Sequence, residues 1–348
     1  MGELTAISKR SLQHFRTQTD PIADAVIEQF FPQNKDQLFT CLQSLDDNSK
    51  KLNDTAGSAL IALYDDAWNK ASVLDGQVLS KGQKFFNEHA SDIMLLLGML
   101  SLPYCYAAAN GAEVLVRSKR ILDEPEKRLL ETAEFVFNVS ARNAFEKKGK
   151  ALPEILKVRL MHAAARWYAK NASDWNTETL GEPVNQEDMA GTNLAFSLIV
   201  IRGLKKLGKS ISSAEAYDYI NYWNQIGRLL GLDEKLLPES NKAAYVLERN
   251  IRERQFSRSE AGIQLTRSLL MYFESATQDS PMKGLSKAMV EYLLGDLVSD
   301  LLEVNNSSFD KVSFQPIKYF LKFQNQLSLK NDSYAVAFQQ FRQIQQQL

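Results

Sequence analysis

Apolar residues recur at helical spacing along most of the chain, and the residues around them mark where helices begin. Asp20 precedes Pro21, which is the usual order of an N-cap residue and a proline in the first helical turn. The apolar positions that follow lie three or four residues apart, as on one face of a helix: Ile22, Val26, Ile27 and Phe30. The same pattern follows Pro125 and Pro153, so each of these stretches is expected to be helical.

The C-terminal third continues this pattern. Residues 243–276 are expected to form one or two long helices, and residues 285–304 one strongly amphipathic helix. No run of alternating apolar and polar residues predicts a strand, and no fixed-period repeat or flexible linker divides the chain. We therefore predict an all-α fold and a single helical domain over residues 1–348.

The most apolar stretch of the chain is residues 93–112, which carry no charge over about twenty residues, the length of a membrane span. Gly98, Pro103 and Asn110 interrupt it. We therefore expect a buried core helix that breaks near Pro103, and no stable membrane span.

Composition narrows the cellular setting. The formal net charge is −1, so nothing in the overall charge favours a nucleic-acid partner. The two cysteines, Cys41 and Cys105, lie far apart and form no CxxC spacing, which favours a reducing compartment. The first residues lack a basic region followed by an apolar stretch, so we expect no secretory signal and a cytoplasmic protein. The oligomeric state stays open.

Histidine is scarce in this chain, which limits the catalytic possibilities. His14 and His89 have polar or charged neighbours and are expected at the surface. His162 differs, because Arg159 and Arg166 lie at spacings that place all three residues on one stripe of a helix. Two guanidinium groups beside an imidazole favour its neutral form, which is the form that binds iron.

The neighbours of His162 suit a haem. Alanines at positions 163–165 leave room for a flat macrocycle, and arginines can pair with anionic groups such as haem propionates. A single histidine fits the one axial ligand of a haem better than a zinc or di-iron site, which needs several protein ligands. The spacing alone also fits a polar stripe at the edge of a helix without a cofactor.

A second polar element lies upstream, on the helix expected after Pro125. Arg128 and Thr132 are four residues apart, and Glu131 directly precedes the threonine. From spacing alone, these residues also fit a solvent-exposed helix face.

Together the two elements resemble a known family, the latex-clearing proteins and MpaB-type oxygenases. The central motif of that family, Arg-x-x-His-x-x-x-Arg, is matched by Arg159, His162 and Arg166. Its upstream Arg-x-x-x-Thr element is matched by Arg128 and Thr132. Shorter family-like stretches lie at residues 20–24, 102–107, 183–189, 222–227 and 230–232. The resemblance covers residues 10–305, which makes residues 306–348 a C-terminal helical extension.

The resemblance implies a globin-like helical core that holds one haem b. It implies that His162 is the proximal ligand of the iron, and that Arg159 and Arg166 support the haem or its pocket. Arg128 and Thr132 would lie on a helix that lines the distal side, where oxygen binds.

The sequence departs from the latex-clearing proteins at one site position. They carry a lysine directly before the motif threonine, which can cap the iron in a closed state, whereas this chain has Glu131 there. A carboxylate is a poorer resting ligand than an amine, but it can act as an acid or base near bound oxygen. This departure argues against rubber cleavage. Glu113 lies near the position where the family places a catalytic glutamate.

The leading prediction is a haem b-dependent oxygenase that uses O2 on an apolar, unsaturated or isoprenoid-like small molecule, with Glu131 or Glu113 moving a proton. Two alternatives stay open. One is a haem-binding sensor or carrier without turnover, and the other is a helical interaction protein without a cofactor.

Overall fold

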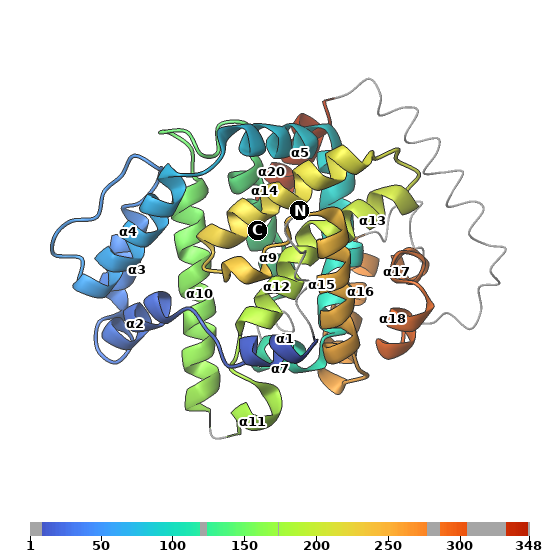
Figure 1. Ribbon diagram of the computed structural model, residues 1–348, viewed down its shortest axis with the longest axis horizontal. Coiled ribbons are helices and arrows are strands. Elements are labelled where there is room, and N and C mark those ends of the chain that lie inside the picture. Colours follow the sequence, from blue (N-terminus) through green and yellow to red (C-terminus); the bar gives the residue numbers. More distant parts are fainter. Residues whose placement is uncertain (1–8, 119–123, 173, 277–285, 305–331, 347–348) are drawn as a thin grey trace, which may run out of the picture. The chain divides into compact units, whose positions relative to one another are not determined.

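The computed structural model describes residues 9–118, 124–172, 174–276, 286–304 and 332–346 (Figure 1). Within these ranges every named element is a helix, and the one β-type pairing is an isolated bridge between Ala108 and Phe256. The predicted all-α class is therefore confirmed. No helix in these ranges is both long enough and apolar enough to cross a membrane.

The chain divides into two compact units, which are described separately. The first unit comprises residues 1–84, 134–193 and 218–247, and the second comprises residues 85–133, 194–217 and 248–348. The boundaries between the units fall within helices: α5 (Gly76–Leu96), α9 (Pro125–Ser140), α12 (Gln186–Phe196), α14 (Ser213–Leu229) and α15 (Asn241–Gln255).

The first unit is built around the long helix α10 (Ala151–Asn171), which packs against α2 (Pro21–Phe30) and α4 (Ser58–Ser72) (Figure 1). Asp20 caps α2 by accepting a hydrogen bond from the backbone N–H of Ala23 at 3.3 Å, and Pro21 stands in its first turn. Both features agree with the sequence pattern. The other helices wholly within this unit are α1 (Lys9–Phe15), α3 (Lys35–Gln43), α11 (Thr177–Leu180) and η2 (Glu234–Leu236).

The apolar core of this unit comes from segments far apart in the chain. Val26 and Ile27 of α2, Leu60 and Leu63 of α4, and Leu156 of α10 are each at most 1% exposed and belong to one cluster. Helical spacing on each element brings these side chains to a common side, so burial of the cluster holds the three helices together.

In the second unit, α16 (Glu260–Ala276) packs against α6 (Leu102–Tyr106), α7 (Ala109–Arg117) and α17 (Ser286–Leu294). The helices wholly within this unit are η1 (Leu97–Ser101), α6 (Leu102–Tyr106), α7 (Ala109–Arg117), α13 (Leu198–Lys206), α16, α17 (Ser286–Leu294), α18 (Asp296–Leu301) and α20 (Ser333–Gln345). Of the C-terminal extension expected at residues 306–348, the part at 306–331 lies outside the described residues, and α20 follows it.

The apolar stretch at 93–112 is buried and interrupted, but not where the sequence predicted. A π-helical turn, η1, follows α5, and Pro103 lies inside the first turn of α6 rather than ending a helix. Proline is tolerated there because its missing N–H falls among the first-turn donors that lack an intrahelical partner. The break comes later, at Ala107 and Ala108, where α6 gives way to α7.

Two further expectations concern the helices of the C-terminal third. Residues 243–276 form two helices, α15 and α16. The single helix expected at 285–304 is instead divided into α17 and α18 by Gly295, which has φ +80°. A backbone in that region favours glycine and ends a helix.

Candidate functional site

The predicted stripe lies on α10 and consists of two buried arginines and a half-buried histidine. The side chains of Arg159 and Arg166 are 1% and 2% exposed, and His162 lies between them. Tyr168, by contrast, is exposed on the same helix. The two arginines of α10 therefore face protein.

Arg159 is held by two carboxylates. Its Nε and Nη2 donate to the two oxygens of Asp20 at 2.8 and 2.9 Å, and its Nη1 donates to Asp66 at 2.6 Å. Burial alone lowers the pKa of Arg159, but the hydrogen bonds and charges of Asp20 and Asp66 raise it above its ordinary value. The guanidinium therefore stays charged, and its three nitrogens are already engaged. This differs from the expectation that Arg159 is free to bind a propionate.

Arg166 is engaged less completely. Its Nε donates to Asp24 at 2.6 Å and its Nη1 to the carbonyl of Val184 at 3.2 Å. Its Nη2 is buried and has no hydrogen-bond partner within the part of the chain that the structure describes. A buried guanidinium N–H without an acceptor is costly, so this nitrogen is suited to an anionic group from outside the protein.

Three of the five short segments that resemble the family lie around these arginines. Gly231 has φ +84°, and a Cβ atom there would lie 2.7 Å from Oδ2 of Asp20 and 3.3 Å from Nε of Arg159. Gln186 donates to the carbonyls of Thr19 and Gly231, each at 2.9 Å. The segments 20–24, 183–189 and 230–232 therefore surround the Asp20–Arg159 ion pair, in addition to any role at a cofactor.

The three histidines have different surroundings. His14 is exposed as predicted, whereas His89 is half-buried against Phe85, with ring centroids 4.8 Å apart. Burial lowers the pKa of His89 below its ordinary value of 6.5. The Nδ1 atom of His162 is buried. No group of three or more His, Cys, Asp or Glu side chains suited to a metal ion occurs in the described ranges.

The upstream element forms a local cluster on α9, within the second unit. Nη1 of Arg128 lies 3.2 Å from Oγ1 of Thr132 and 3.8 Å from Oε2 of Glu131. The Thr132 hydroxyl also donates to the carbonyl of Arg128 at 3.0 Å. These three predicted residues therefore lie together. Glu113, on α7, pairs instead with Arg117 at 3.7 Å.

One buried polar cluster was not predicted. The carboxylate of Glu248 is 3% exposed and accepts from Arg202 at 2.6 Å, from Arg252 at 2.9 Å and from the hydroxyl of Tyr104. Burial and the nearby carboxylate raise the pKa of Tyr104, so its hydroxyl stays protonated and continues to donate. The cluster joins α6 and α13 to the part of α15 that lies in the second unit. Tyr104 lay in a segment that the sequence singled out, but nothing in its spacing indicated Glu248 as a partner.

Comparison with known proteins decides the family. The family described as "ER-bound oxygenase mpaB/B'/Rubber oxygenase, catalytic domain" matches residues 88–322, which is more than half of the chain. The chain belongs to this family. The matched range includes every site residue that the sequence predicted, whereas Asp20, Asp24 and Asp66 lie before it.

Two relatives of this family give the extent of the likeness. The chain is 24% identical over 232 residues to the "Rubber oxygenase" of Streptomyces sp. (strain K30), an alignment that covers 66% of this chain and 56% of the relative. The chain thus spans little more than half of that relative's length. The solved structure of "Latex Clearing Protein LCP in the closed state" matches with a TM-score of 0.78 at 19% identity, over 98% of this chain and 93% of that one. The predicted resemblance and the single all-α fold are therefore confirmed.

Proposed function

We propose that this member of the oxygenase family is a haem b-dependent oxygenase that uses O2 on an apolar, unsaturated or isoprenoid-like small molecule. The proposal rests on family membership together with one structural feature, the half-buried His162 on a helix whose two arginines are fixed by carboxylates. A single imidazole supplies the one protein ligand that a b-type haem requires.

The residues around His162 fit such a group. The neutral imidazole of a histidine is the form that ligates iron. Asp20 and Asp66 fix Arg159, and Asp24 fixes Arg166, so α10 is held in place on the side of these arginines. The buried Nη2 of Arg166 lies one turn from His162 along α10, and it would donate to a propionate.

A bound haem would supply the redox chemistry that activates O2. The protein contributes the ligand, the fixed helix and the groups that move protons. Arg128 holds a positive charge beside Glu131 and donates to Thr132, which orients the cluster on α9. Glu131 serves in the proposal as the acid or base, with Glu113 as the second candidate.

The ligand assignment is tested by the absorption spectrum of the full chain expressed with added haem. We expect a Soret band in the wild type and in His14→Ala, whose histidine is exposed on α1. His162→Ala should lose the band or bind haem at least tenfold more weakly. A wild type without a Soret band contradicts the proposal, and a His162→Ala variant that binds haem as tightly as the wild type contradicts the assignment of the ligand.

The enzymatic step is tested by O2 consumption with an unsaturated isoprenoid hydrocarbon and its saturated analogue. We expect O2 uptake with the unsaturated compound, and a reduced rate in Glu131→Gln without loss of the Soret band. Haem binding without O2 uptake across such substrates would favour the sensor or carrier over the oxygenase.

A further inference from the structure

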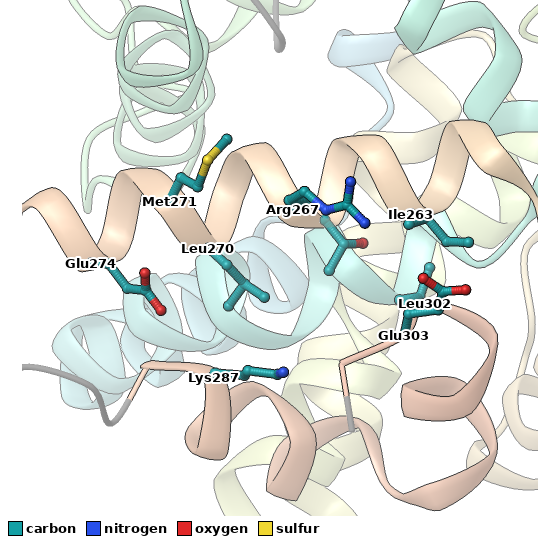
Figure 2. Close-up of a pocket in the computed structure, with 9 residues that line it drawn as sticks. Ile263, Arg267, Leu270, Met271, Glu274, Lys287, Leu302 and Glu303 are labelled. Carbon is teal, nitrogen blue, oxygen red and sulfur yellow. The ribbon is translucent and has the colours of Figure 1, made fainter. Parts of the chain in front are cut away.

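A cavity of about 200 Å³ opens beside α16, wholly within the second unit (Figure 2). Its apolar lining consists of Ile263, Leu270 and Met271 of α16 together with Leu302. Of these, Ile263 and Leu302 are buried, whereas Met271 is 59% exposed. An exposed methionine at the mouth of an apolar cavity is a flexible side chain that can pack on a ligand.

Two cations are among the residues that line this cavity. Figure 2 shows Arg267 of α16 and Lys287 of α17 between Glu274 at one end and Glu303 at the other. Glu303 is engaged by Arg258. Neither Arg267 nor Lys287 forms an ion pair or side-chain hydrogen bond with any described residue. The lining therefore carries two positive charges that no described residue pairs.

We propose that this cavity is a binding site for an amphipathic monocarboxylate with a hydrocarbon tail and up to about eight carbons in all. The carboxylate lies between Arg267 and Lys287, and the tail lies against Ile263, Leu270 and Leu302. A guanidinium binds a carboxylate through two parallel hydrogen bonds, and an ammonium adds a point charge beside it. This site is separate from the residues of the proposed oxygenase function.

The size of the cavity limits the tail. An apolar cavity of about 150 Å³ holds one benzene molecule, which has six carbons. By proportion, the 200 Å³ here holds about eight carbons. Burial of each methylene should raise the affinity about fourfold until the cavity is filled, and further methylenes should add little.

The test is calorimetric titration of the full chain with butanoate, hexanoate, octanoate and decanoate. We expect saturable binding of one octanoate per chain, with an affinity that rises from butanoate to octanoate and then levels off. Octanamide, which has the same tail without the charge, should bind at least tenfold more weakly. Absence of saturable octanoate binding, or equal binding of octanamide, overturns the proposal.

Variants locate the site. The double variant Arg267→Gln with Lys287→Gln should bind octanoate at least tenfold more weakly, whereas Lys205→Gln, an exposed lysine on α13 outside the cavity, should bind like the wild type. Met271→Glu, which brings a negative charge to the mouth, should weaken binding, and Met271→Leu should not. Because these side chains are at least partly exposed, far-UV circular dichroism should show the same helical content in all four variants. Octanoate binding that the double variant and Met271→Glu leave unchanged places the ligand elsewhere and overturns the proposal.

Discussion

Gly231 offers a sharp test of how tightly the Asp20–Arg159 ion pair is enclosed. In Gly231→Ala, the new Cβ would lie 2.7 Å from Oδ2 of Asp20 and 3.1 Å from its Cγ. The carboxylate cannot move away cheaply, because Arg159 donates to both of its oxygens at 2.8 and 2.9 Å. Gly208 is the matched control: its φ of +85° is nearly the same as the +84° of Gly231, but a Cβ there meets nothing within 4 Å.

Both substitutions place alanine in a left-handed backbone conformation, but only Gly231→Ala also overpacks its surroundings. Alanine in the left-handed region costs about 1–2 kcal/mol at either position. Reduced freedom of the unfolded chain offsets part of this cost equally in both variants. Gly231→Ala adds the cost of overpacking, about 1–3 kcal/mol, because either the carboxylate or the turn must shift.

Urea unfolding, followed by tryptophan fluorescence, measures the difference. We expect Gly231→Ala to lower the free energy of unfolding by about 1–3 kcal/mol more than Gly208→Ala does, with unchanged m-values. Equal losses in the two variants, within about 0.5 kcal/mol, would refute the close enclosure of the ion pair.

Other predictions concern charge. Asp20→Asn leaves the buried Arg159 without its bidentate partner and should lower the free energy of unfolding by about 3 kcal/mol. Asp46→Asn, which removes a 66% exposed carboxylate paired with Lys50, should lower it by less than about 0.5 kcal/mol. Similar losses for the two variants in urea unfolding would contradict this prediction. Because burial lowers the pKa of His89 in the folded protein, the unfolded chain binds more protons as the pH falls below 6.5. The fall in the free energy of unfolding between pH 7.5 and pH 5 should therefore be smaller in His89→Gln than in the wild type.

Local signals in the sequence predicted the start of α2 and the stripe on α10 correctly. Asp20 and Pro21 specify a helix start by chemistry that needs no tertiary partner. The spacing of Arg159, His162 and Arg166 likewise fixes their common side of a helix, whatever packs against it. Family membership, which these short motifs indicated, is confirmed.

What the sequence did not give depends on contacts between distant segments. The carboxylates that hold Arg159 lie 139 and 93 residues away, so no spacing rule relates them to it. The division at Gly295 could have been predicted, because glycine often ends a helix. The continuous amphipathic pattern of residues 285–304 pointed instead to one helix. The π-helical turn η1 has no comparable sequence signal. The role of His162 as an iron ligand stays a prediction.

The packing of α10 on α2 and α4 also orders events during translation. The Asp20 carboxylate leaves the ribosome 139 residues before its partner Arg159. At 5–20 residues per second, that interval is roughly 7–28 s. Once they have emerged, Val26 of α2 and Leu60 of α4 lack the helix that completes their core cluster until α10 follows. The nascent N-terminal helices therefore expose apolar surface that chaperones recognise, and a synonymous change that slows synthesis before Arg159 would lengthen that exposure without altering the finished protein.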